Sequence, residues 1–143
     1  MNYTSIFCKT FSFLIFVSAS VFTFAQETTY TDIEFAGVFD GTTYDGDFYN
    51  FPSGSAAWAG FANLDASIYP LSFTDGGEIT FTGATSGTDA EVYFRFEYNS
   101  YPDTEPSFNT IAVVVSGIDD ASYYVAIPAQ GTNTFSSFLF FVT

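Results

Sequence analysis

The sequence has no histidine, one cysteine and two basic residues among its 143 positions. Histidine is the usual general base and the commonest zinc ligand, so its absence excludes Ser-His and Cys-His nucleophilic catalysis and ordinary zinc sites. The one cysteine, Cys8, lies in a segment that we expect to be removed on secretion. The mature chain is therefore expected to fold without disulfides, and a bound metal would be calcium held by oxygen atoms.

Positive charge is scarce: Lys9 and Arg95 stand against sixteen acidic residues, for a formal net charge of −14. All sixteen acids lie after residue 25, so Arg95 is the only basic residue of the expected mature chain, whose balance is −15. Phosphate recognition needs lysine and arginine, which excludes nucleic acid as a partner and disfavours polyanionic substrates. The acids are spread along a chain that is 22% aromatic, which is not typical of disorder. The simplest interpretation of the charge is a solubilising surface.

Residues 1–25 have the pattern of a secretory signal peptide. Lys9 supplies the charge, an apolar run from Phe11 to Val17 follows, and Thr23-Phe24-Ala25 resembles a small-residue cleavage site. A transmembrane helix is the competing interpretation, but serine and threonine interrupt the apolar segment and the run is short for a bilayer. We therefore expect a secreted, extracellular protein with no membrane span once the signal is removed.

Removal of residues 1–25 from the 143 leaves 118, which is enough for one domain with its own core. A polar leader is expected over residues 26–31, and the domain over residues 32–143. No long window carries a helical period, while short alternating runs recur about every ten residues with turn signals between them. This spacing predicts an all-β protein, an antiparallel β-sandwich of the jelly-roll type with about eight strands.

Several expected strands can be placed from alternation and turn signals. They are Asp32–Val38, a short pair within Phe39–Pro52, the run after Gly76-Gly77, Asp89–Tyr101, Thr110–Ser116, Ser122–Pro128 and Thr134–Val142. Gly117–Asp120 is expected to join its two neighbours as a hairpin. Thr134–Val142 is apolar on both faces with no partner after it, which predicts an exposed apolar edge and a last strand or following module that is missing.

Asp89–Tyr101, with the sequence DAEVYFRFEYNSY, is the clearest of these strands. In a strand, alternate side chains point to opposite faces of the sheet. The positions expected to face the core are Val92, Phe94, Phe96 and Tyr98. The positions on the other face are Glu91, Tyr93, Arg95, Glu97 and Asn99. One face is therefore core, and the other presents an aromatic ring, a guanidinium and carboxylates.

We interpret the polar face as a candidate sugar-binding site. A sugar ring has an apolar face and a rim of hydroxyls, so a site for it combines aromatic platforms with planar hydrogen-bonding groups. The predicted ligand-binding residues are Tyr93, Arg95, Glu97, Asn99, Tyr101, Tyr69, Asn63 and Trp58. In the alternative interpretation, Arg95 only forms ion pairs with acids on neighbouring strands.

Trp58 is the only tryptophan, and the sequence allows two interpretations of it, an exposed ring or a core residue. An exposed tryptophan would be the natural stacking platform, yet tryptophan is usually largely buried. The small neighbours Ala57, Ala59 and Gly60 favour a core position for Trp58. Tyr69, in a loop, is expected to be the more exposed ring.

The turn segment DGTTYDGD, residues 40–47, is rich in carboxylates. Calcium binds roughly six to eight oxygens, so Asp40, Asp45 and Asp47 are candidate ligands of a structural calcium ion. The spacing matches no EF-hand loop, and turn formation accounts for the same residues without a metal. No carboxylate pair stands out that would serve glycoside hydrolysis.

Three segments, WAGFAN, GGEITFTG and YFRFEYN, carry a family resemblance. From about Thr31 to the end, the chain resembles the small β-sandwich carbohydrate-binding modules attached to secreted glycoside hydrolases of marine bacteria, notably laminarinase-like enzymes. The resemblance implies a non-catalytic jelly-roll module that binds a polysaccharide, a β-glucan or similar algal glycan, with an attached catalytic module as a partner.

Two other functions remain open from the sequence: a structural or adhesive extracellular sandwich without glycan binding, and a fragment of a glycoside hydrolase. Exposure distinguishes the first of these from a binding module. A binding module should present at least two aromatic rings and Arg95 on one accessible face, whereas a structural domain should bury them.

Overall fold

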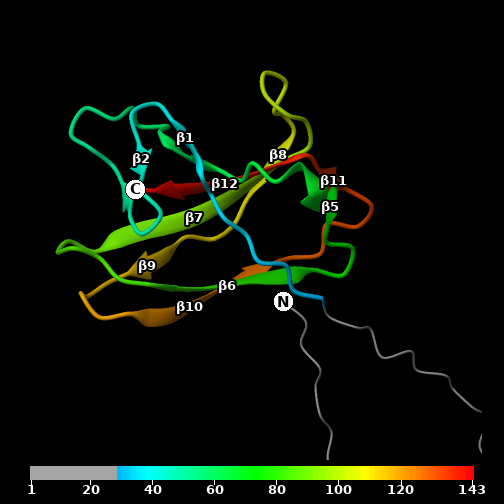
Figure 1. Ribbon diagram of the computed structural model, residues 1–143. Helices are drawn as coiled ribbons and strands as arrows, with labels where there is room; N and C mark the ends of the chain where they lie inside the picture. Colours follow the sequence, from blue (N-terminus) through cyan, green and yellow to red (C-terminus); the bar gives the residue numbers. More distant parts are fainter. Residues whose placement is uncertain (1–28) are drawn as a thin grey trace, which may run out of the picture. The chain divides into compact units, whose positions relative to one another are not determined.

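Figure 1 shows the protein as a computed structural model, which describes residues 29–143. The chain divides into two units, residues 1–33 and Glu34–Thr143, and every strand lies in the second unit. The predicted signal peptide, residues 1–25, lies outside the described residues, as does the start of the predicted leader. Residues 29–143 contain strands and a single 3-10 turn, Ala66–Ile68, which confirms the all-β prediction. They include no helix that is long and apolar enough to span a membrane.

The larger layer is a six-stranded antiparallel sheet in the order β1-β4-β12-β7-β8, with β9 also paired to β7. Its strands are β1 (Gly37–Phe39), β4 (Gly60–Ala62), β7 (Ala90–Glu97), β8 (Ser107–Asn109), β9 (Val113–Val115) and β12 (Ser137–Val142). The last strand, β12, is hydrogen-bonded to β4 on one side and to β7 on the other. The predicted exposed apolar edge is therefore wrong, since β12 is apolar on both faces because it is a central strand.

The second layer is the antiparallel pair of β6 (Gly77–Gly83) and β10 (Ala121–Ile127). In Figure 1 this pair lies beneath β7 and β9, so the two layers have the arrangement of an antiparallel β-sandwich, as predicted. Two short pairs complete the domain. They are β2 (Thr43–Tyr44) with β3 (Tyr49–Asn50), and β5 (Leu71–Ser72) with β11 (Thr134–Phe135). The β2–β3 pair is the one predicted within Phe39–Pro52.

The turn at Gly117–Asp120 is not a hairpin, which corrects a prediction. It follows β9, which pairs with β7, and precedes β10, which pairs with β6, so the chain crosses from one layer to the other. The β6–β7 connection crosses in the same way, and the two crossings are tied together because the Thr85 backbone N–H donates to the Gly117 carbonyl at 2.7 Å. Turn residues specify that a chain reverses, but tertiary packing decides which strand becomes the partner.

Two other strand predictions differ from the structure. Of the segment Asp32–Val38, only the end joins a strand, β1. The segment Thr110–Ser116 is shortened to β9, and β8 forms just before it, in a stretch where no strand was predicted. Thr110 explains the interruption, because its buried hydroxyl accepts the Phe94 backbone N–H at 3.0 Å and takes the place of a backbone carbonyl in the ladder.

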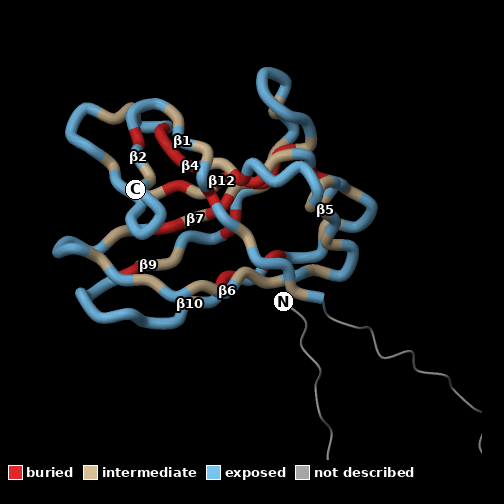
Figure 2. Tube along the Cα trace, viewed as in Figure 1, coloured by how far each residue is buried: buried red, intermediate tan, exposed pale blue. Residues whose placement is uncertain are grey.

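The core between the layers consists mainly of phenylalanine side chains. On β7, Val92, Phe94 and Phe96 are buried, as the alternation predicted. Phe96 stacks on Phe138 of β12 with the ring centroids 4.3 Å apart, and Phe81 of β6 meets Phe94 edge-on at 5.8 Å. Figure 2 shows the buried positions along β4, β7 and β12. This packing of rings holds the domain together without disulfides.

Candidate functional site

The candidate site is the outer face of the six-stranded sheet, defined as the face turned away from β6 and β10. The strand register places its side chains beside one another, since neighbours opposite each other in a sheet project to the same side. Tyr93 lies opposite Phe141 of β12, and Arg95 lies between Leu139 of β12 and Asn109 of β8. The predicted polar face of β7 therefore continues onto the strands on both sides.

Three aromatic side chains form a row across this face, which we call the ring row: Tyr93, Phe141 and Phe39. Tyr93 and Phe141 are stacked at 5.1 Å with an interplanar angle of 9°, and Phe141 meets Phe39 edge-on at 5.9 Å. Gly60 of β4 permits this closure, because a Cβ there would lie 2.9 Å from both the Phe141 and the Phe39 rings. Tyr93 and Phe39 are half-buried, whereas Phe141 between them is buried at 9% exposed, so the row is partly exposed only at its two ends.

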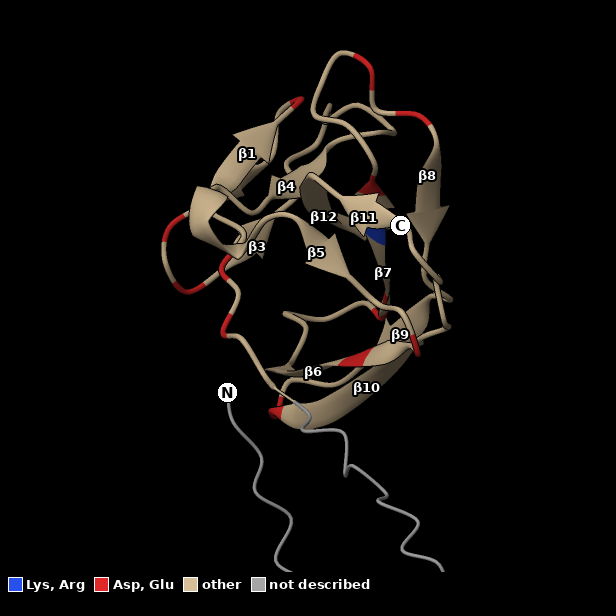
Figure 3. Ribbon diagram, turned by 90° about the vertical axis from the view of Figure 1, so that its right-hand side faces the viewer, with Lys and Arg blue, Asp and Glu red and all other residues tan. Residues whose placement is uncertain are grey.

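An ion triad adjoins the ring row on β7. The Arg95 Nε donates to Glu97 at 2.9 Å, and its Nη2 donates to Glu105 at 2.6 Å. The Ser107 hydroxyl also donates to Glu105, and Arg95 and then Ser107 hold the pKa of that carboxyl below its usual range. Figure 3 shows the arginine segment on β7 among acidic segments. One guanidinium with two carboxylates leaves a net negative charge, which repels anionic ligands.

Arg95 does form ion pairs, but not the cross-strand pairs of the alternative interpretation. Glu97 lies two residues along the same strand, and Glu105 lies in the loop that leads to β8, rather than on neighbouring strands. The Arg95 side chain is 23% exposed and the Glu97 side chain 9%. Arg95 therefore has limited surface left for direct contact with a ligand.

The other predicted residues fall into two groups. Asn63 is buried, donates its amide to the Glu34 carbonyl at 2.8 Å and accepts the Asp65 N–H at 3.0 Å, so it ties the 63–69 loop to the start of the domain. Tyr69 is half-buried, its pKa is raised by burial, and its hydroxyl lies 3.5 Å from the Asn63 carbonyl. In contrast, Asn99 and Tyr101 are exposed in the loop after β7.

Trp58 is 67% exposed, so the prediction of a core position is wrong. It lies in the turn Ala56–Ala59, which is closed by the Ala59 N–H donating to the Ala56 carbonyl at 2.9 Å. The small neighbours Ala59 and Gly60 are buried where the turn meets β4, which begins at Gly60, whereas Trp58 lies within the turn. The expectation that Tyr69 would be the more exposed ring is wrong as well.

The turn that carries Trp58 is anchored beside the ring row. The Ala56 N–H donates to the Asp40 carbonyl at 3.1 Å, and the Ser55 hydroxyl donates to the Gly41 carbonyl at 3.2 Å. These carbonyls belong to the turn that directly follows Phe39, which ends β1. The turn that carries Trp58 thus lies at the β1–β4 end of the sheet.

Sequence reasoning missed three rings: Phe39 and Phe141 of the ring row, and the exposed Phe48. Phe39 and Phe141 join Tyr93 only through strand pairing over long sequence separations, for which local alternation carries no signal. Phe48 is exposed in the segment DGDFYN. Its position directly after an Asp-Gly turn was a usable signal, because turn residues lie at the surface.

The predicted calcium ligands form turns in the structure. The Asp45 carboxylate accepts the backbone N–H groups of Asp47 and Phe48 at 3.0 and 2.8 Å, and the donation from Phe48 and then Asp47 lowers its pKa. Asp40 has a φ of 56° in the turn with Gly41. Within residues 29–143, no group of three or more acidic or sulfur-bearing side chains is placed to hold a metal. Calcium binding stays a prediction from the sequence, and a chelator-induced fall in melting temperature would support it.

Comparison with protein-family models, curated proteins and solved structures finds no match to this chain. The family resemblance therefore stays a prediction based on the three sequence segments.

Proposed function

We propose that the domain Glu34–Thr143 is a non-catalytic module of a secreted protein that binds a neutral polysaccharide such as a β-glucan. The observation that carries the proposal is the ring row of Phe39, Phe141 and Tyr93, together with the exposed Trp58 in a turn hydrogen-bonded to the turn that follows Phe39. Aromatic rings on an accessible sheet face offer a stacking surface for the apolar side of sugar rings. An attached catalytic module is part of the same proposal.

Polar groups beside the ring row suit the hydroxyl rim of a sugar. Asn109 is exposed next to Arg95 in the register, and its amide can both donate and accept hydrogen bonds. The net negative charge of the triad of Arg95, Glu97 and Glu105 favours an uncharged ligand over uronic acids or sulfated sugars. Together these features support a neutral glycan.

Trp58→Ala tests the proposal in the most direct way. After a glycan array with the mature domain, affinity for a soluble β-1,3-glucan is measured by calorimetry. Loss of the indole platform should weaken binding about ten- to hundredfold, which corresponds to roughly 1.4 to 2.8 kcal/mol. The free energy of unfolding should change by less than about 0.5 kcal/mol, because the side chain is exposed.

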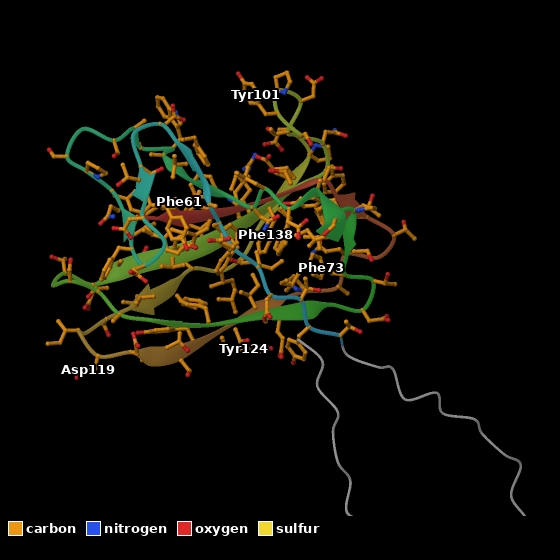
Figure 4. All side chains as sticks on the ribbon, in the orientation of Figure 1. Phe61, Phe73, Tyr101, Asp119, Tyr124 and Phe138 are labelled. Atoms are coloured by element: carbon orange, nitrogen blue, oxygen red, sulfur yellow. The ribbon has the colours of Figure 1, made fainter. Side chains whose placement is uncertain are left out.

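Tyr124→Ala is the matched control for Trp58→Ala. Tyr124 is also an exposed aromatic residue, but it lies on β10, in the other layer of the sandwich (Figure 4). Its removal should leave the glucan affinity unchanged. Equal losses in both variants would indicate non-specific adsorption to rings, and no binding of any neutral glycan by the parent would contradict the proposal.

One observation favours a second candidate, a structural or adhesive domain without glycan binding. Arg95 has two carboxylate partners within the domain, and Phe141 is nearly covered. These two side chains of the outer face therefore have little surface left for a ligand. In this case Trp58 and the ring row would contact another protein, and the array would show no bound glycan.

A further inference from the structure

The loop Asn99–Pro106 carries Tyr101, the most exposed large hydrophobic side chain of the described domain. Tyr101 is 88% exposed, and Figure 4 shows it at the tip of the loop, away from the packed rings of Phe61 and Phe138. A tyrosine buries much apolar area when it finds a partner, so a fully presented ring at a loop tip is available for contact. Tyr101 belongs neither to the ring row nor to the turn that carries Trp58, so the site described above does not explain why its ring is exposed.

Hydrogen bonds hold the two ends of this loop together. The Tyr98 N–H donates to the Pro106 carbonyl at 3.1 Å, and the Asn99 amide donates to the Glu105 carbonyl at 3.4 Å. The strongest contact is the charged hydrogen bond of 2.6 Å from Arg95 to the Glu105 carboxylate, to which the Ser107 hydroxyl also donates. These contacts join the end of the loop to β7 and limit the positions open to the segment that carries Tyr101.

We infer that Tyr101 is a second ligand contact, and that Arg95 acts as a positioning residue that holds the loop through Glu105. The inference rests on the proposed function and deepens it. Two of the Arg95 nitrogens are engaged with carboxylates and its side chain is only 23% exposed, so its effect on binding passes through the loop.

The separation of the two exposed rings defines the class of ligand. Trp58 precedes β4 at the level of the ring row, whereas Tyr101 lies beyond the opposite end of β7, past Glu97. A strand advances about 3.3 Å per residue, so the outer face between Tyr93 and Asn99 is about 20 Å long. Contact with both rings requires an extended polysaccharide that crosses the face, and a short oligosaccharide reaches only one ring.

A double-mutant cycle with Tyr101→Ala and Glu105→Ala tests the inference. Arg95 keeps Glu97 as its ion-pair partner when Glu105 is removed, so the cycle leaves no charge without a partner. Affinities are measured by calorimetry for a soluble β-1,3-glucan and for its tetrasaccharide. Tyr101→Ala should weaken binding of the polymer about tenfold and leave the tetrasaccharide bound as in the parent. Glu105→Ala should weaken polymer binding about threefold or more, and the double variant should bind like Tyr101→Ala alone, because loop position has no effect once the ring is gone.

Glu105→Gln provides the rescue, because an amide oxygen still accepts the hydrogen bond from Arg95. It should restore part of the polymer affinity that Glu105→Ala loses. If the losses from Tyr101→Ala and Glu105→Ala add, the ion triad touches the ligand directly and the inference is wrong.

The outcome can be separated from that of the proposed function. If Trp58→Ala loses glucan binding while Tyr101→Ala binds the polymer like the parent, the second contact is refuted and the proposed function stands. If the parent binds neither the polymer nor the tetrasaccharide, both the proposed function and the second contact at Tyr101 are refuted.

Discussion

The two faces of β7 place similar residue types in different environments. On the inner face Phe96 has no exposed surface and contacts the rings of Phe73, Phe108, Phe135 and Phe138. On the outer face Tyr93 is half-buried and stacks on the single ring of Phe141. The comparison shows that the number of packing partners, rather than aromatic character, separates a residue that holds the fold from one that is free to meet a ligand.

Charge follows the same division. The guanidinium and the two carboxylates of the ion triad belong to the outer side of the sheet and the loop beside it. The inner face of β7 consists of apolar side chains. A charge on that side would lose its hydration without a partner, which costs several kcal/mol. The outer face tolerates charges because water, Glu97 and Glu105 stabilise Arg95.

Phe96→Ala should give the largest effect, on stability. Removing a fully buried ring from several ring partners typically costs about 3 to 5 kcal/mol, a large share of what a domain of this size has. Chemical denaturation measures the change, and Tyr93→Ala is the matched control on the outer face, with less than half the loss. Similar losses in the two variants would abolish the distinction between the faces.

Gly60→Ala should have an intermediate effect on stability, and it tests how closely the ring row packs over β4. The added methyl would lie 2.8 Å from the Phe140 carbonyl oxygen and 2.9 Å from the rings of Phe141 and Phe39, so these groups must shift. Such overpacking typically costs about 1 to 3 kcal/mol. Gly87→Ala is the control, since nothing lies within 4 Å of its added methyl. Unchanged stability and near-ultraviolet circular dichroism in Gly60→Ala would contradict the close packing of the rings over β4.

Glu105→Gln should give the smallest effect on stability, and the size of this effect depends on pH. The pKa of Glu105 is lowered from 4.5 by Arg95 and by Ser107, so its ionised form stabilises the folded state above that value. The parent should melt at a slightly higher temperature than Glu105→Gln at pH 7. The gap should close as the pH falls below 4.5 through the lowered pKa, because both proteins then carry a neutral group at this position. A gap that persists at pH 3 would show that the carboxylate charge is not the source of the stabilisation.

Local pattern in the sequence was enough to predict several features of this protein. The alternation of Val92, Phe94 and Phe96 with Tyr93 and Arg95 predicted the two faces of β7, because a strand projects successive side chains to opposite sides whatever its neighbours are. Turn residues predicted the β2–β3 pair, and the absence of a helical period predicted the all-β fold.

Only the tertiary structure decided which strands meet and which rings are exposed. The central place of β12, the crossing between layers at Gly117–Asp120 and the gathering of Phe39 and Phe141 beside Tyr93 all depend on pairing between distant segments. Trp58 is exposed because it lies in the turn before β4, and of its small neighbours Ala57 is exposed and Ala59 is buried. Local alternation specifies the face of a strand, but the register and partner of that strand come from the burial of the whole core, which no short segment encodes.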